Sequence, residues 1–298
     1  MQWRWCELSA LHTEYDVDVG NGLTLHADRS GHGPALLLLH GFTGSSATWD
    51  SLRPALEPHF SVIAVDLPGH GRSGAPADDT RYALHHLADD LAALLDAVGV
   101  DRAAVLGYSM GGRAALHFAI AHPERVSALI LESATPGIES AHDRGARIDS
   151  DFALADMIER DGVESFVHFW ERLPIWSSQA ALPGDVRQTV HERRLANGPT
   201  GLANSLRGAG AGARPSVARQ LESLPMPTLL MAGALDPKFV ELARVMHEFI
   251  PDARTEIVSG AGHTVHLERP TEFIAIVNEF LVSALGSSGG GEWPPSVG

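Results

Sequence analysis

Ser109 stands in the stretch of this sequence that most clearly suggests chemistry. It lies in Gly107-Tyr108-Ser109-Met110-Gly111, a G-x-S-x-G pattern that follows the apolar run 103–106 and precedes a helical pattern from Met110 to His122. A sharp turn from a strand into a helix lifts a serine hydroxyl above the sheet, and small glycines give the backbone room for that turn. The pattern therefore predicts a reactive serine, with the Met110 N–H at a helix N-terminus ready to stabilise an oxyanion.

A serine hydroxyl is a weak nucleophile or base at pH 7, so an imidazole must take its proton and a carboxylate must orient that imidazole. Asp236 follows the late apolar run 228–232, and His263 follows the next one. Both positions are C-terminal strand ends, where ligands collect in open α/β sheets. Asp236 could instead cap the helix after it, and His266 competes with His263 as the base. The order Ser, Asp, His predicts a triad of Ser109, Asp236 and His263.

The loop after residues 35–39 supplies the second expected oxyanion donor, the backbone N–H of Phe42. His40, in the same loop, and His70, in a later glycine-rich loop, are interpreted as structural histidines. The sequence contains no H-E-x-x-H, Cys/His cluster or P-loop pattern, so metal and nucleotide chemistry have no support.

Apolar runs alternate with helical patterns along most of the chain. The expected strands are 14–19, 23–28, 35–39, 62–65, 103–106, 128–131, 228–232 and 255–258, and the expected helices are 48–56, 84–98, 110–122, 240–249 and 270–285. The Asn21-Gly22 pair predicts a tight turn between the first two strands. Continuous apolar strands separated by helices predict an α/β fold, with a mostly parallel sheet and helices on both faces.

The alternation stops between Pro136 and Leu224. This segment has no convincing strand, but it has helical patterns near 147–160, 163–172 and 186–195. We interpret it as a helical cap inserted over the sheet. The expected organisation is a core in two parts, 1–135 and 225–285, the cap at 136–224, and a disordered Gly/Ser/Pro-rich tail at 286–298.

Composition limits the classes of partner. A formal net charge of −15 argues against general binding to nucleic acid or to an anionic membrane. Cys6 is the single cysteine, which excludes an intramolecular disulfide and fits a reducing compartment. The N-terminus lacks the apolar core of a signal peptide, and no apolar run is long enough to span a membrane. We therefore expect a soluble cytoplasmic protein, of unspecified oligomeric state.

Of the 22 basic residues, all but Lys238 are arginines. Genomic base composition accounts for such a bias by itself. Guanidinium groups also bind carboxylates in a bidentate manner, so arginines near Ser109 would suit an anionic substrate.

Four segments give the chain a specific resemblance. They are 107–113 (G-Y-S-M-G-G-R), 131–137 (L-E-S-A-T-P-G), 202–208 (L-A-N-S-L-R-G) and 236–239 (D-P-K-F). Over roughly residues 14–285 the sequence resembles the α/β-hydrolase superfamily, and within it the 2-succinyl-6-hydroxy-2,4-cyclohexadiene-1-carboxylate synthases of menaquinone biosynthesis.

The resemblance implies a cofactor-free lyase on a hydrolase scaffold. It would eliminate pyruvate from 2-succinyl-5-enolpyruvyl-6-hydroxy-3-cyclohexene-1-carboxylate, a small anionic polycarboxylate. Ser109, activated by His263 and Asp236, would act as a general base, and the N–H groups of Phe42 and Met110 would stabilise the developing charge. The pocket residues that the resemblance implies are Tyr108, Arg113, Arg147, Trp170 and Arg194, with Arg193 as an alternative to Arg194.

Two other functions fit parts of the sequence. A carboxylesterase or C–C bond hydrolase would use Ser109 as a nucleophile, and a ligand-binding receptor would keep the fold without catalysis. A pocket rich in arginine favours the lyase, because neutral esters need no such cations.

Overall fold

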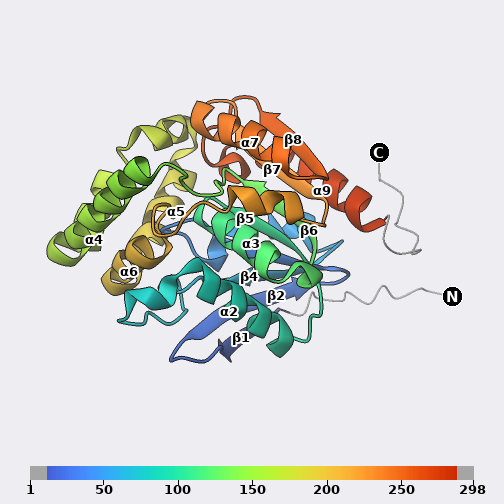
Figure 1. Ribbon diagram of the computed structural model, residues 1–298, viewed down its shortest axis with the longest axis horizontal. Coiled ribbons are helices and arrows are strands. Elements are labelled where there is room, and N and C mark those ends of the chain that lie inside the picture. The colour runs from blue at the N-terminus through green and yellow to red at the C-terminus, as the bar shows by residue number, and fades with distance from the viewer. Residues whose placement is uncertain (1–11, 287–298) are drawn as a thin grey trace.

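A computed structural model describes residues 12–286 of the chain, and a sheet of eight strands lies at its centre (Figure 1). The strands are β1 (Thr13–Asp18), β2 (Thr24–Gly31), β3 (Ala35–Leu39), β4 (Ser61–Val65), β5 (Ala103–Tyr108), β6 (Val126–Glu132), β7 (Thr228–Gly233) and β8 (Ala253–Val258). Their order is β1-β2-β4-β3-β5-β6-β7-β8. The β1–β2 and β2–β4 pairs are antiparallel and the remaining pairs are parallel. Cys6 and most of the predicted disordered tail lie outside the described residues.

The burial of each strand follows from its position in the sheet. Every residue of β4 and β5 is buried, as expected for apolar strands that are covered on both faces. The edge strand β1 alternates between exposed and partly buried residues instead. The predicted turn joins β1 to β2, with positive φ at both Asn21 and Gly22.

Helices cover both faces of the sheet. They are α1 (Arg53–Leu56), α2 (Leu84–Ala97), α3 (Met110–Ala121), α7 (Pro237–Phe249), α8 (Val265–Glu268) and α9 (Pro270–Gly286). Helices α2, α3 and α7 share one core with Ala103 and Val105, whereas α1, α8 and α9 share the other with Ala104 and Leu106. Successive residues of β5 thus point into opposite cores, and the predicted α/β fold, a mostly parallel sheet with helices on both faces, is confirmed.

Three further helices lie together beside the sheet, between β6 and β7 in the chain (Figure 1). They are α4 (Ala141–Trp170), α5 (Gly184–Leu195) and α6 (Pro199–Ala209). Helices α4 and α6 bury a small core of their own, which includes Ile158, Phe166 and Leu202. We refer to α4, α5, α6 and the 3₁₀ segment Pro174–Ala181 as the cap.

Three predicted helices differ from the structure. The expected helix 48–56 is divided into a 3₁₀ turn, Ser46–Trp49, and the short α1. Pro54 lies in the first turn of α1, where a backbone N–H would have no partner within the helix. In the interior of one continuous helix, proline would remove a hydrogen bond and clash with the preceding turn, so the chain forms two short helices instead. The expected helices 147–160 and 163–172 are joined in α4, which ends at Trp170 and whose backbone leaves the helical region at Gly162, with φ of 82°.

Helix α6 was not among the predicted helices. Its start is marked by Pro199 at the first helical position, directly after Gly198. Gly201 and Gly208 lower the helix propensity of this segment, so only the packing of α6 against its neighbours reveals it.

No helix within residues 12–286 is long and apolar enough to cross a membrane.

Candidate active site

Ser109 occupies a strained turn between β5 and α3. Its φ and ψ are 52° and −104°, and it is the N-cap of α3. A Cβ at Gly107 would overlap the Gly111 carbonyl, and one at Gly111 would overlap the Leu39 carbonyl. The G-x-S-x-G glycines are therefore required by close backbone approach, and the serine stands at the carboxyl edge of the sheet.

Ser109, His263 and Asp236 form a continuous hydrogen-bonded triad. His263 Nε2 lies 3.0 Å from Ser109 Oγ, and His263 Nδ1 lies 2.7 Å from Asp236 Oδ2. The imidazole is nearly fully buried, with 2% of its surface exposed. With Nδ1–H donating to the carboxylate, Nε2 can accept the serine proton. Asp236 also accepts from Phe239 N at 3.5 Å as the N-cap of α7. This residue therefore both orients His263 and caps a helix.

The competitor His266 and the loop histidines His40 and His70 are hydrogen-bonded to groups other than Ser109. His266 Nδ1 lies 2.8 Å from Glu132 Oε2, in a pair that is almost completely buried. His40 Nδ1 lies 2.8 Å from the Gly41 carbonyl, and burial lowers the pKa of His40. His70 Nδ1 lies 3.0 Å from the Pro68 carbonyl, and burial lowers the pKa of His70 to about 3. Both loop histidines are therefore neutral at pH 7 and brace the backbone.

Two residues of the cavity that holds the serine have backbone N–H groups without a partner in the described part of the chain. Among the described residues, the N–H groups of Phe42 and Met110 donate to no other protein group. Both residues line the same cavity as Ser109. Unsatisfied N–H groups beside a reactive oxygen are suited to stabilising negative charge that develops there.

A cavity of about 300 Å³ separates the triad from the cap. The predicted site residues in its wall are Phe42, Tyr108, Ser109, Met110, Arg113, Arg147, Trp170 and His263. Asp236 lies behind His263 and is not part of the wall. We call this space the triad cavity.

The triad cavity is cationic. Burial, and to a lesser extent Arg147, lowers the pKa of Arg113 to about 10, so this guanidinium stays charged at pH 7. Arg147 reaches the cavity from α4, and Lys238 from the start of α7. Lys238 was not predicted as a pocket residue, although it stands in the D-P-K-F segment two residues after Asp236. Three cations beside a reactive serine suit an anionic ligand.

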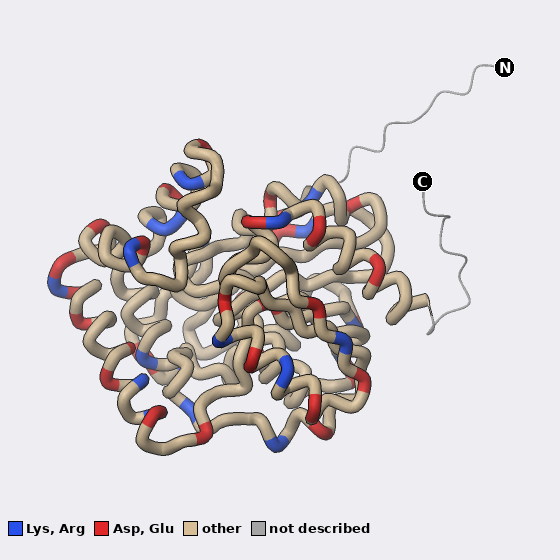
Figure 2. Tube along the Cα trace, turned by 90° about the horizontal axis from the view of Figure 1, so that it is seen from above, with Lys and Arg blue, Asp and Glu red and all other residues tan. Residues whose placement is uncertain are grey.

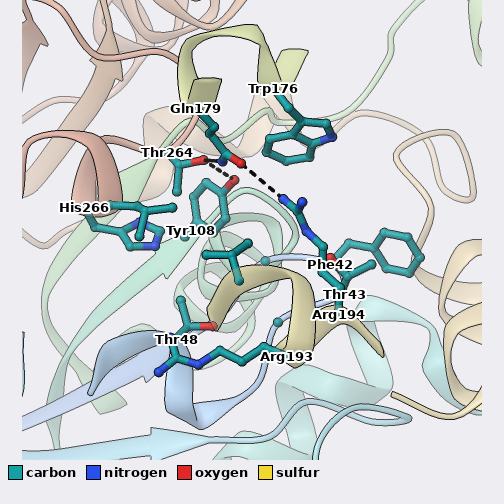
Figure 3. A pocket seen from close by; sticks show the side chains of 14 residues that line it. Phe42, Thr43, Thr48, Tyr108, Trp176, Gln179, Arg193, Arg194, Thr264 and His266 are labelled. Carbon is teal, nitrogen blue, oxygen red and sulfur yellow. Dashed lines mark hydrogen bonds between the residues drawn. The ribbon is translucent and has the colours of Figure 1, made fainter. Parts of the chain in front are cut away.

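Arg194 lies in a neighbouring cavity rather than in the wall of the triad cavity. This side cavity, of about 60 Å³, shares Phe42, Tyr108 and Trp176 with the triad cavity (Figure 3). Arg194 Nη1 lies 3.0 Å from Glu171 Oε1, and its guanidinium lies 5.1 Å from the Trp176 ring. These cap contacts hold the side chain away from Ser109.

Arg193 lines the side cavity as well, but it pairs with Asp50 at 3.3 Å. Arg194 is the more buried of the two, with 7% of its surface exposed.

A chain of polar contacts links Arg194 to Tyr108, the residue before Ser109 (Figure 3). Arg194 Nη2 donates to Gln179 Oε1 at 3.4 Å, and Gln179 Nε2 donates to Thr264 Oγ1 at 2.9 Å. Thr264 Oγ1 lies 3.3 Å from the Tyr108 hydroxyl, whose pKa burial raises far above its ordinary value. Tyr108 is therefore a neutral hydrogen-bonding group. Sequence reasoning did not identify Gln179, because only the packing of the cap brings it to Thr264.

Among residues 12–286, no three His, Cys, Asp or Glu side chains are grouped so that they could hold a metal ion.

Known proteins resemble this chain in sequence and in fold. The model of the α/β hydrolase fold family matches residues 34–270. A Bacillus subtilis (strain 168) protein, provisionally named as a 2-succinyl-6-hydroxy-2,4-cyclohexadiene-1-carboxylate synthase, is 46% identical over 84% of this chain and 90% of its own length. The synthase of that name from Serratia proteamaculans (strain 568) is 31% identical over 84% of this chain and 94% of its own length.

One solved structure, that of MenH from S. aureus, is similar with a TM-score of 0.82. It is 33% identical, and the match covers 92% of this chain and 98% of that chain.

Proposed function

Because this chain belongs to the 2-succinyl-6-hydroxy-2,4-cyclohexadiene-1-carboxylate synthase family of α/β hydrolases, we propose that it eliminates pyruvate from 2-succinyl-5-enolpyruvyl-6-hydroxy-3-cyclohexene-1-carboxylate. The product is 2-succinyl-6-hydroxy-2,4-cyclohexadiene-1-carboxylate. The observation that carries the proposal is the meeting of a hydrogen-bonded triad with three cations in one cavity. A substrate with several carboxylates needs cationic partners in a partly desolvated site.

The triad can catalyse this elimination by general acid–base chemistry. Ser109 Oγ passes its proton to His263 Nε2, across the 3.0 Å between them, as it removes a proton from the substrate ring. The electron pair of the broken C–H bond shifts into the ring, and the C–O bond to the enolpyruvyl group breaks. The departing enolate takes a proton from the His263 imidazolium and becomes pyruvate, which returns the imidazole to its neutral state. Asp236 stabilises the transient imidazolium at 2.7 Å.

Charge that develops on the substrate is expected to lie near the free N–H groups of Phe42 and Met110. Preorganised donors of this kind typically contribute about 10²–10³ in rate each. Arg113, Arg147 and Lys238 would bind carboxylates, and Tyr108 and Trp170 would shape the wall. No covalent intermediate is required.

A coupled assay tests the proposal. Pyruvate release from the cyclohexene substrate, generated in situ, is followed with lactate dehydrogenase, with an enzyme-free control because the substrate loses pyruvate spontaneously. Wild type should release pyruvate well above that control and Ser109→Ala should not, while Ser51→Ala, at an exposed serine outside the cavity, should match wild type. Release no faster than the control would contradict the proposal.

Carboxyl ester hydrolysis is the second candidate, favoured by the direct hydrogen bond that would activate Ser109 as a nucleophile. An esterase would show an acyl-enzyme burst with p-nitrophenyl esters, whereas a general-base lyase should turn them over poorly.

We also propose a cytoplasmic location, which the single cysteine supports.

A further inference from the structure

Asp151 places a buried carboxylate in the wall of the cationic triad cavity. It lies on α4, has 2% of its surface exposed, and lines the cavity with Arg113 and Arg147. A carboxylate in that position repels an anionic substrate and loses its own hydration. A carboxylate that is unfavourable for both folding and anion binding is expected to have a specific role.

The contacts of Asp151 indicate that role. Arg147 Nε lies 2.8 Å from Asp151 Oδ1 and 2.9 Å from Oδ2, so both oxygens accept from a single N–H. The two residues are four positions apart on one helix, which puts them on the same face. A guanidinium has five N–H donors, and no described residue accepts from the four on the Nη atoms of Arg147. The Nη edge therefore stays available to a ligand.

The end of α6 forms the other side of this corner. Gly210 packs so closely that a Cβ there would lie 2.5 Å from Asp151 Oδ2. The Ala209 carbonyl, one residue earlier, accepts a hydrogen bond from Arg113 Nη1. Backbone packing thus fixes the carboxylate, which in turn fixes Arg147, and the same segment fixes Arg113.

We propose that Asp151 is a positioning residue for substrate binding, which anchors Arg147 through Nε so that its Nη edge is presented to one carboxylate of the substrate. The negative charge of Asp151 also offsets the repulsion between Arg113 and Arg147 when the cavity is empty. The inference rests on the proposed function for the identity of the anion, but not for the anchoring itself.

A double-mutant cycle tests whether Asp151 acts through Arg147. Arg147→Ala should raise KM about 30-fold, the low end of the change expected for loss of a charged contact to a carboxylate, because the Arg147 side chain is partly exposed. Asp151→Asn should raise KM about tenfold with kcat within about threefold, and the double variant should be no worse than Arg147→Ala alone. Asp149→Asn removes an exposed carboxylate from the same helix and should leave both constants unchanged.

Independent effects would overturn the proposal. If the two substitutions multiply in the double variant, or if Asp151→Asn leaves KM within twofold of wild type, Asp151 does not position Arg147. Should Asp151→Asn fail to fold, Gly210→Ala keeps both side chains. Its Cβ would meet the Leu206 carbonyl as well as Asp151 Oδ2, so it should displace the carboxylate and raise KM at least about fivefold. An unchanged KM in that folded variant would equally contradict the anchoring.

A binding measurement separates this inference from the proposed function. Citrate, a polycarboxylate probe, is titrated calorimetrically into wild type, Asp149→Asn and Asp151→Asn. Affinity that falls about tenfold only in Asp151→Asn supports the anchoring even if no pyruvate is released. Equal affinity in all three would reject the anchoring, whatever reaction the triad catalyses.

Discussion

Asp236 performs two functions that a single substitution can separate. Its carboxylate lies 2.7 Å from His263 Nδ1, and it accepts from Phe239 N as the N-cap of α7. Asparagine is as good an N-cap as aspartate, but its amide favours the wrong imidazole tautomer. Catalysis and helix capping should therefore respond differently to Asp236→Asn.

We expect Asp236→Asn to lower the rate of pyruvate release by about 10⁴-fold with little change in Tm. Asp236→Ala loses the cap as well and should lower Tm by about 2–4 °C, for a cap worth about 1 kcal/mol. Pyruvate release and thermal unfolding measured on both variants check this. The prediction fails if the asparagine variant keeps a tenth of the activity or melts as early as the alanine variant.

Residues tied to strand ends could be predicted from the sequence, whereas residues placed by cap packing could not. Ser109 and His263 each follow an apolar run and have glycines beside them, so the sequence predicts that both lie at the carboxyl ends of strands. Asp151 and Gln179 are ordinary polar residues in variable helical patterns. Their roles arise from where α4 and the segment Pro174–Ala181 pack, which no local pattern determines.

At the scale of elements, α6 attaches the cap to the core through backbone contact. A Cβ on Gly201 would overlap the Gly69 carbonyl, so the helix lies directly on the loop after β4. Asn197 and Asn204 add hydrogen bonds across the same boundary, to the Thr43 and Pro76 carbonyls. This helix is the fixed side of the cap.

Gly201→Ala should therefore destabilise the protein. Forcing a methyl group into this contact should cost about 1–3 kcal/mol, which corresponds to a fall in Tm of roughly 2–12 °C. Gly145→Ala is the matched control, since a Cβ on this α4 glycine would meet nothing within 4 Å and the substitution should raise Tm slightly. Thermal unfolding of both variants checks the prediction, and equal Tm values would show that α6 can move aside.

Over the whole molecule, acidic and basic residues are interspersed along the trace (Figure 2). Many of them form ion pairs, as Arg207 does with Glu159 and Asp156. The net charge of −15 thus coexists with a triad cavity lined by Arg113, Arg147 and Lys238. Charges beyond about 8 Å are largely screened at physiological ionic strength. Binding of an anionic substrate therefore depends chiefly on the cations that line the triad cavity. The net charge of the chain alone could not predict the charge of its ligand.

Two neutral histidines, the buried His70 and the partly buried His117, make the stability of the whole molecule depend on pH. Burial lowers the pKa of His70 to about 3 and that of His117 to about 4, from the ordinary value of 6.5. Below pH 6.5 the unfolded chain binds protons at these positions and the folded chain does not. The stability that these histidines contribute is complete above pH 6.5, and it is lost as the pH falls toward 4 for His117 and toward 3 for His70.

The slope of that loss gives the last prediction. Each histidine should remove about 1.4 kcal/mol of unfolding free energy per pH unit between pH 6 and pH 5. His70→Gln should reduce the slope by about that amount, whatever it does to stability at pH 7, because glutamine does not titrate. His142→Gln, at an exposed histidine, should leave the slope unchanged. Urea unfolding at several pH values measures the slopes, and identical slopes for His70→Gln and wild type would mean that the folded protein protonates His70.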